Sequence, residues 1–387
     1  MTRLGDVFPL IRNGASIKQT DGAEGLPITR IETIANREID RSRMGYADVT
    51  DLVKYADYQL QDGDILMSHI NSEKHLGKVA RYKAIDGEYI IHGMNLLMLR
   101  ADKSLITPGY AECFFNSDVF LRQIPNITKK SVNQASFNVS ALKELQIPIP
   151  TLTTQHEIEM RFEKVDSLIS LRKQQIAKLD ELVKARFVEM FGDPVSNPKM
   201  WPVECAAAHI DLLSGYPFDS SQYTDDGINI CGGLIIMPQR IAWDECKHWR
   251  SIEGFEEYAL QENDIVMALD RPWISDGFKI AMIDAEHLPA LLIQRTARIR
   301  ATDINQQYLM YCFMNGGFDK HCNITGSLVP HISAKDIRSF PIMIPPLAFQ
   351  QQFAAFVAQT DQQKLTIQHS LAQLELLKKA LMQKYFG

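Results

Sequence analysis

Apolar side chains recur at alternating spacings of four and three positions along residues 155–190, and the pattern returns near the end of the chain. This spacing is the a/d seam of a coiled-coil helix. From Ile158 to Met190 it covers 33 residues, which as a helix extend about 50 Å. The sequence therefore predicts two long helices. Their apolar seam positions are Ile158, Phe162, Val165, Ile169, Ile176, Leu179 and Val183 in the first helix and Phe353, Val357, Ile367, Leu371, Leu374 and Leu381 in the second.

Polar residues interrupt both seams. Arg172 and Arg186 fall on the first seam, and Thr360, Lys364 and Lys378 fall on the second. A polar residue at such a position often sets the register of a coiled coil at a cost in stability. One interpretation packs each helix on the core of its own domain. The length and the duplication of the helices favour another, in which they pack on each other, antiparallel, as a rigid rod.

The segments 1–150 and 193–345 have a different pattern, with short apolar runs separated by turns that contain glycine and asparagine. Such runs are typical of strands. Prolines at the end of each segment, such as Pro150 and Pro345, stop it before its helix begins. The expected strands are 27–31, 64–67 and 96–99 in the first segment and 228–230, 264–267 and 291–293 in the second.

The chain contains an internal repeat with a period of about 195 residues, which is a signal to look for before any other. Residues 185–192 match 380–387, and 147–158 match 342–353, both at an offset of 195. Residues 138–141 match 331–334 at an offset of 193, and 61–68 match 261–268 at an offset of 200. The shared order makes chance an unlikely source and predicts approximate two-fold symmetry, which suits a bipartite target.

These patterns predict an α/β (α+β) fold with an internal pseudo-two-fold repeat. Two mixed segments, 1–150 and 193–345, are separated by two long antiparallel coiled-coil helices, 151–192 and 346–387. Each half of the repeat is then one mixed segment followed by one long helix.

Composition and charge narrow the function classes. The 387 residues are 45% hydrophobic and 23% charged, as in an ordinary globular protein. With no run of 18 apolar residues and no apolar N-terminal run, no membrane partner and a cytoplasmic location are expected. The net charge is −6, and residues 193–345 hold 12 basic and 20 acidic residues. Any nucleic-acid-binding face must therefore come from local clustering of cations.

Recognisable catalytic and metal-binding motifs are missing from the sequence. It has no phosphate-binding P-loop, no G-x-G-x-x-G nucleotide cradle, no G-x-S-x-G elbow and no H-E-x-x-H pair. It also lacks the Asn- or Asp-Pro-Pro-aromatic tetrad of amino-methyltransferases, because Ile344 precedes the prolines at 345 and 346. None of the six cysteines forms a C-x-x-C pair, so no metal is expected. We therefore expect a chain that is not an enzyme.

The repeat, the junctions at 147–158 and 342–353 and the long terminal helices together resemble the specificity subunit of type I restriction–modification systems. The resemblance covers essentially the whole chain. The run 191–194, Phe-Gly-Asp-Pro, and the opening of the second half at 213–218 also fit it. The counterpart of that opening in the first half, 11–14, departs from the pattern and leaves the boundary there less defined.

The resemblance implies a function. Segments 1–150 and 193–345 become target-recognition domains, each of which reads one half of a bipartite double-stranded DNA site. The helices become spacers that fix the gap and dock two methyltransferase subunits. The catalytic residues and S-adenosylmethionine belong to those partners, so this chain binds no cofactor itself. A restriction subunit, a translocase and nuclease, joins in the complete complex.

Two polar loops in each segment are the candidates for contacting DNA, because they follow strands and carry hydrogen-bonding or cationic side chains. They span 68–75 and 128–134 in the first segment and 270–275 and 325–331 in the second. Lys129, Lys130 and Arg271 stand out as cations that offset phosphate charge. For any single loop, an ordinary solvated loop is the better interpretation, and Trp273 is as easily a core aromatic. The candidates are Ser68, His69, Asn71, Lys74, Lys129, Lys130, Asn133, Arg271, Trp273, Ser275, Ser327 and His331.

Two other functions fit the same observations less well. One is a DNA-binding or scaffolding subunit of another defence or modification system with the same duplicated architecture. The other is a nuclease or methyltransferase with an unrecognised site, which the missing motifs disfavour. Methyl transfer by the pure chain would separate this last class from a specificity subunit.

Overall fold

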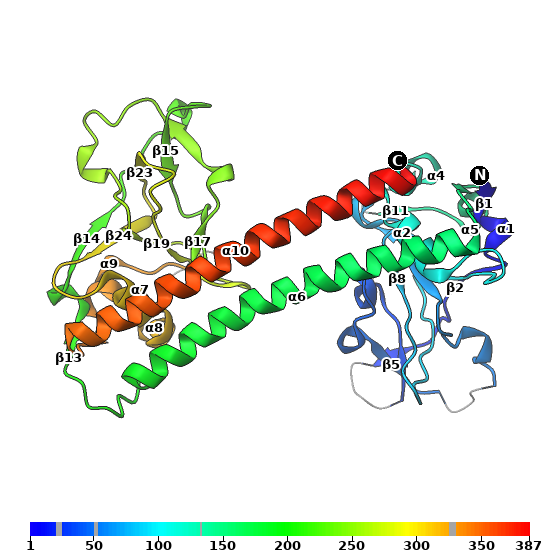
Figure 1. The fold of residues 1–387 in the computed structure, drawn as a ribbon, viewed down its shortest axis with the longest axis horizontal. Coiled ribbons are helices and arrows are strands. Elements are labelled where there is room, and N and C mark those ends of the chain that lie inside the picture. Colours follow the sequence, from blue (N-terminus) through cyan, green and yellow to red (C-terminus); the bar gives the residue numbers. More distant parts are fainter. Residues whose placement is uncertain (21–24, 50–52, 132–133, 325–329) are drawn as a thin grey trace. The chain divides into compact units, whose positions relative to one another are not determined.

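The computed structural model describes residues 1–20, 25–49, 53–131, 134–324 and 330–387. Its contacts divide into two compact units. The first unit comprises residues 1–173 and 369–387, and the second comprises residues 174–368. Each unit contains one mixed segment together with part of each long helix, α6 (Leu152–Phe191) and α10 (Leu347–Phe386), both of which are unbroken (Figure 1).

A four-stranded antiparallel sheet in the order β2-β9-β6-β8 organises the first unit. All four residues of β6 (Ile65–Ser68) are buried, because the sheet is covered on both faces. Ile65 and Met67 belong to the larger core, together with aromatic residues of α2. Leu66 points to a smaller core on the opposite face. Because successive side chains of a strand point to opposite faces, β6 contributes side chains to both cores.

Most other strands of the first unit are short and form two- and three-stranded sheets. Its elements are β1 (Thr2–Arg3), α1 (Leu4–Val7), β2 (Leu10–Asn13), β3 (Gln19–Thr20), β4 (Leu26–Ile28), β5 (Gly45–Ala47), β6 (Ile65–Ser68), β7 (Ile70–Asn71), β8 (Val79–Arg81), β9 (Leu96–Arg100), α2 (Pro108–Phe115), α3 (Asp118–Leu121), α4 (Ile124–Ile127), β10 (Lys129–Lys130), β11 (Ala135–Ser136), α5 (Val139–Lys143), β12 (Gln146–Ile147) and the start of α6.

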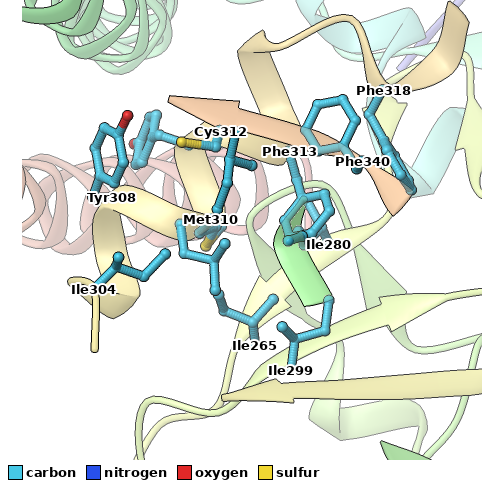
Figure 2. Packing of buried hydrophobic residues seen from close by; sticks show 14 of the residues in the cluster. Ile265, Ile280, Ile299, Ile304, Tyr308, Met310, Cys312, Phe313, Phe318 and Phe340 are labelled. Carbon is cyan, nitrogen blue, oxygen red and sulfur yellow. The ribbon is translucent and has the colours of Figure 1, made fainter. Parts of the chain in front are cut away.

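The second unit repeats this plan with the sheet β14-β24-β19-β22, again antiparallel. In the register of the first sheet, Ile65 pairs with Arg81 on one side, and in the second Ile265 pairs with Met282. Figure 2 shows the core between this sheet and α7, in which Ile265 and Met310 share one cluster. The two units are therefore copies of one construction, which confirms the fold class expected from the repeat.

The second unit shares the central sheet and the helix that follows it with the first, and it adds the hairpins β16-β17 and β20-β21. Its elements are β13 (Val203–Cys205), β14 (Ile210–Ser214), β15 (Ile228–Cys231), β16 (Ile236–Met237), β17 (Arg240–Ile241), β18 (Lys247–Trp249), β19 (Ile265–Ala268), β20 (Trp273–Ile274), β21 (Gly277–Phe278), β22 (Ile280–Met282), β23 (Ala290–Leu292), β24 (Thr296–Ala301), α7 (Gln306–Asn315), α8 (Phe318–His321), α9 (Ala334–Ser339), β25 (Pro341–Met343) and the start of α10.

A buried glutamine joins each segment to its long helix and explains one of the repeated motifs. Gln155 is fully buried; its side-chain oxygen accepts the N–H of Thr107 at 2.8 Å, and its amide donates to Pro150 O at 2.9 Å. Gln350 makes the equivalent bonds with Asn305 N and Pro345 O, both at 2.8 Å. Satisfying a buried amide on both sides fixes the angle at which the helix leaves its segment.

The first long helix begins at Leu152, three residues before the apolar spacing that starts at 155 and one residue inside the predicted bounds 151–192. Its first turn is capped by Thr151, whose hydroxyl accepts the N–H of Thr154 at 3.3 Å. It ends at Phe191, where Gly192 takes a φ of +85°. The predicted strand at 27–31 is wrong beyond Ile28, because the hydroxyl of Thr33 accepts the Arg30 N–H and a 3-10 turn begins.

Within each unit α6 and α10 pack on each other in antiparallel directions. In the first unit Phe162 stacks on Phe386, and Asp166 accepts a bond from Lys378 at 2.5 Å. In the second unit Asp180 accepts a bond from Lys364 at 2.6 Å. The numbering on one helix falls as that on the other rises, so the antiparallel pairing expected from the sequence is confirmed.

Both interpretations of the seam apply, to different parts of the helices. Near the segments, seam residues enter the domain cores; Ile158 and Phe162 do so in the first unit, and Val183, Phe353 and Val357 in the second. Val165 is also buried. The other seam residues are half-buried: Ile169, Ile176, Leu179, Ile367, Leu371, Leu374 and Leu381.

Candidate nucleic-acid interface

The two candidate loops of the first segment are brought together by a small sheet. Strand β7 begins two residues after β6 ends and pairs with β11, which in turn pairs with β10. Loop 68–75 and the described part of loop 128–134 therefore lie side by side, although they are distant in sequence. A three-stranded sheet with polar side chains can present several hydrogen-bonding groups at once to a groove of DNA.

Exposed cations surround this sheet. Lys74, Lys129 and Lys130 are exposed, and Lys130 forms an ion pair with Glu73 at 2.7 Å. Both partners of that pair are largely exposed, so the pair is weak in water and can give way to a phosphate. The pKa of His75 is lowered by partial burial and by the cations of Lys78 and Lys74. The side of the loop that carries these residues is therefore positively charged.

Two of the candidates in the first segment lie beneath the surface. Ser68 has 2% of its surface exposed and His69 has 6%. Both are buried, because all of β6 lies between two covered faces and the chain directly after it remains inside the fold. Burial lowers the pKa of His69 to about 4. Asn71 is half-buried, and Asn133 lies outside the described residues.

The candidate loops of the second segment are also adjacent. Asp270 and His331 form an isolated bridge between them, and the Asp270 carboxylate lies 2.7 Å from His331 Nδ1. The N–H of Arg271 donates to Pro330 O at 2.8 Å. Arg271 is exposed and has a φ of 45°, a left-handed conformation in which its neighbours hold it. Ser327 lies outside the described residues.

Trp273 and Ser275 lie on the hairpin formed by β20 and β21. Trp273 is half-buried, stacks on Phe278 with ring centroids 5.1 Å apart and packs against the larger core. Ser275 is exposed, and its hydroxyl donates to Asp276 at 3.0 Å. Trp273 therefore supports the hairpin, while Ser275 is open to a ligand.

The comparison with known families decides what kind of protein carries these loops. The family model described as "Type I restriction modification DNA specificity domain" matches residues 1–181 and, again, residues 250–376. The chain belongs to this family. One match falls in each half of the repeat, so the family domain is present twice.

Individual relatives are specificity subunits of the same kind of system. The chain is 41% identical over 196 residues to a putative type I restriction enzyme MjaX specificity subunit of Methanocaldococcus jannaschii; the alignment covers 51% of this chain and 46% of that protein. It is 31% identical over 189 residues to the EcoAI specificity subunit of Escherichia coli, covering 45% and 31%. The chain thus spans less than half the length of these two relatives.

Solved structures share the fold at low sequence identity. The S subunit of a type I restriction–modification system from M. genitalium matches with a TM-score of 0.57 and 12% identity, over 100% of this chain and 95% of that one. A chain from a study of complex assembly in the type I R-M system matches with a TM-score of 0.54 and 16% identity, over 99% and 96%. Similarity at this level extends to the fold alone.

Two residues of the second unit's site were not among the candidates, although Asp270 lies within candidate loop 270–275. Asp270 holds both His331 and, at 3.7 Å, Arg295. Arg295 has a φ of 68°, and Asn95 at the equivalent place has a φ of 75°. This shared backbone conformation depends on the turn between two strands. It could not be predicted from the residue types, because one position is an arginine and the other an asparagine. Only the contact between distant loops brings Asp270 and Arg295 into the site.

No metal-binding or membrane-spanning feature accompanies the loops in the part of the chain that the structure describes. Among those residues, no three His, Cys, Asp or Glu side chains gather as a metal site would require. Nor does any described helix combine the length and the apolar character needed to cross a bilayer.

Proposed function

We propose that this chain is the DNA-reading specificity subunit of a type I restriction–modification complex. Each mixed segment would bind one half of a bipartite site in double-stranded DNA. The observation that carries the proposal is the repeated pairing of two polar loops beside exposed cations, once in each unit. A duplicated reader suits a target with two parts.

The candidate residues divide into two kinds of contact. The exposed cations Lys74, Lys129, Lys130 and Arg271 would neutralise phosphates, which positions the protein without reading sequence. Hydrogen-bonding side chains such as Asn71 and Ser275 would read base edges. The buried Ser68 and His69 would act only by shaping the first loop, because neither reaches solvent. His331 would hold the two loops of the second unit together through Asp270.

The long helices would set the gap between half-sites and dock the catalytic partners. Each helix is 40 residues long and takes part in both units. Large apolar side chains are exposed along both, at Met160 (61%) and Leu376 (69%) in the first unit and Leu365 (59%) in the second. Exposed apolar groups of this size are typical of partner surfaces. Two methyltransferase subunits carrying S-adenosylmethionine, and a restriction subunit, would occupy them, and this chain itself would catalyse no reaction.

A salt titration tests the DNA contacts. Each lost phosphate contact lowers the slope of log affinity against log salt by about 1. We expect Lys129→Glu with Lys130→Glu to lower this slope by about 2 and to weaken binding to every DNA sequence alike. The measurement is the affinity of the chain with its methyltransferase partners for target and non-target duplexes over a range of salt concentrations.

Lys247→Glu supplies the matched control, because it reverses an exposed lysine on β18, outside the paired loops. The control should leave the slope close to that of the unaltered chain. Equal losses in the control and in the paired-loop variant would contradict the assignment of this surface.

A further inference from the structure

The two mixed segments differ in the residues that they carry where each one joins its long helix: ionic in the first unit and apolar in the second. The comparison is possible because the repeat aligns the junctions residue by residue. Arg81 occupies the place of Met282, since each lies opposite the equivalent isoleucine of the central strand. Glu112 occupies the place of Met310, since each follows by two residues the tyrosine whose hydroxyl bonds the segment's last strand region.

The helix sides of the junctions differ in the same way. Glu159 and Glu163 lie four and eight residues after the buried glutamine of α6. Ala354 and Ala358 lie four and eight residues after the buried glutamine of α10. Four ionic residues in the first half thus correspond to four apolar residues in the second.

In the first unit one guanidinium binds three carboxylates. Arg81 lies 2.9 Å from Glu112, 2.6 Å from Glu159 and 2.7 Å from Glu163, and only 11% of its side chain is exposed. Thr107 also donates to Glu159 at 3.0 Å. Burial raises the pKa of Glu112, whereas the hydrogen bond from Arg81 lowers that of Glu163.

A glycine makes room for this cluster. A Cβ atom added to Gly109 would lie 1.7 Å from the carboxylate of Glu159, which Arg81 and Thr107 hold in place. In the second unit Gln307, the residue before the tyrosine of α7, stands at the position of Gly109, and Ala354 stands at the position of Glu159. Between the two units, the side chains at these positions therefore differ in both size and charge, on the domain as well as on the helix.

At the four corresponding positions of the second unit no residue is ionic. Met310 is 4% exposed and belongs to the larger core, where Figure 2 labels it; Met282 packs against the same core. Ala354 is half-buried and Ala358 exposed, so no carboxylate of α10 stands at either position. A buried ion cluster and an uncharged set of side chains are alternative ways to build such a junction.

We propose that these four pairs of positions form a matching rule that decides which recognition domain each helix accepts. A helix with glutamates four and eight residues after its buried glutamine accepts a domain with an arginine at the position of Arg81 and a glutamate at the position of Glu112. A helix with alanines there accepts a domain with the methionine pair. The rule rests on the proposed function only in calling these segments recognition domains. A domain moved to the other helix keeps its loops, but its contact with the helix is less stable. A mismatch leaves buried charges without their partners.

Thermal unfolding of full-length variants tests the rule. Arg81→Met alone leaves Glu112 and Glu159 without a cation, and we expect it to lower the Tm of the first unit by roughly 5–10 °C. Adding Glu112→Met, Glu159→Ala and Glu163→Ala transplants the apolar set of the second unit and should recover most of that loss. Arg3→Met is the control, because Arg3 and Glu144 form an exposed pair, and it should leave the Tm unchanged. A fourfold variant no more stable than Arg81→Met overturns the rule.

A domain transplant tests the rule in the other direction. Residues 1–150 replace residues 193–345, once on the natural α10 and once on α10 with Ala354→Glu and Ala358→Glu. The matched chimaera should unfold at the higher temperature, and equal unfolding temperatures contradict the rule. A matched chimaera that gains this stability, but whose methylation target with the partner subunits does not change, supports the matching rule and contradicts the proposed DNA-reading function.

Discussion

At the scale of single residues, two buried histidines of the first unit correspond to leucines in the second. His69 and His92 have 6% and 0% of their surface exposed in the first unit. The strand registers place Leu269 and Leu292 at the equivalent positions of the second unit. Burial lowers the pKa of His69 to about 4 and that of His92 to about 3. Both rings are therefore held neutral at pH values where an unfolded chain protonates them.

This burial predicts that acid destabilises the first unit selectively. The folded pKa lies below the unfolded value of about 6.5, so the contribution of each ring is fully present above pH 6.5. It is lost progressively as the pH falls from 6.5 toward 4 for His69 and toward 3 for His92. At pH 5 the loss is about 2 kcal/mol for each ring. We expect the unfolding temperature of the first unit to fall between pH 7 and pH 5 by more than that of the second.

Substitution isolates the cause of the acid effect. His92→Leu, which installs the residue of the second unit, should reduce the pH dependence of unfolding. His156→Leu is the control, since 64% of that side chain is exposed. If His92→Leu leaves the difference between pH 7 and pH 5 as large as before, buried imidazole is not its origin.

At the scale of elements, two of the three polar seam residues on α10 find partners on α6, and the third bonds its own helix. Lys364 and Lys378, which interrupt the apolar seam, bind Asp180 and Asp166 at 2.6 and 2.5 Å. Thr360 donates to the carbonyl of Phe356 at 2.9 Å. The cost expected from polar seam residues is therefore offset, and each Lys–Asp pair fits a single register of the two helices.

A charge exchange tests the register. Lys364 is 15% exposed, so Lys364→Asp, which leaves Asp180 facing another carboxylate, should cost roughly 2–3 kcal/mol of unfolding free energy. Adding Asp180→Lys should recover much of it, as a double-mutant cycle in denaturant measures. The same exchange at Lys178 and Glu181, an exposed pair within one helix, should have no measurable effect. Additive losses at Asp180 and Lys364 would show that the pair does not couple the helices.

The sequence was sufficient to predict elements whose signal is local. The spacing of four and three indicates the long helices because it extends over many turns, and the repeat indicates two like units. The pairing of loop 68–75 with loop 128–134 could not be predicted, because it depends on β7 and β11 meeting across the fold. The burial of Ser68 and His69 was missed for a related reason, since a polar type at the end of a strand says nothing of what covers it.

At the scale of the whole chain, the same scaffold carries two different surfaces. Gln155 and Gln350 make the same bonds at the two junctions, and Asp64 and Asp264 bind Arg100 and Arg300 at 2.7 and 2.8 Å. The loops differ between the two units, and so do the four junction positions of the matching rule. A chain that keeps its framework and varies its polar loops is suited to reading two unlike half-sites.

The central claim is that the paired helices measure the distance between two half-sites. One heptad added to both α6 and α10, after residues 173 and 368, lengthens each helix by about 10.5 Å, or about three base pairs of B-DNA. The decisive measurement is genome-wide mapping of methylated bases in cells that carry the partner subunits and either the original or the lengthened chain. The account predicts unchanged half-sites separated by a gap about three base pairs longer. An unchanged gap, or altered half-site sequences, would contradict it.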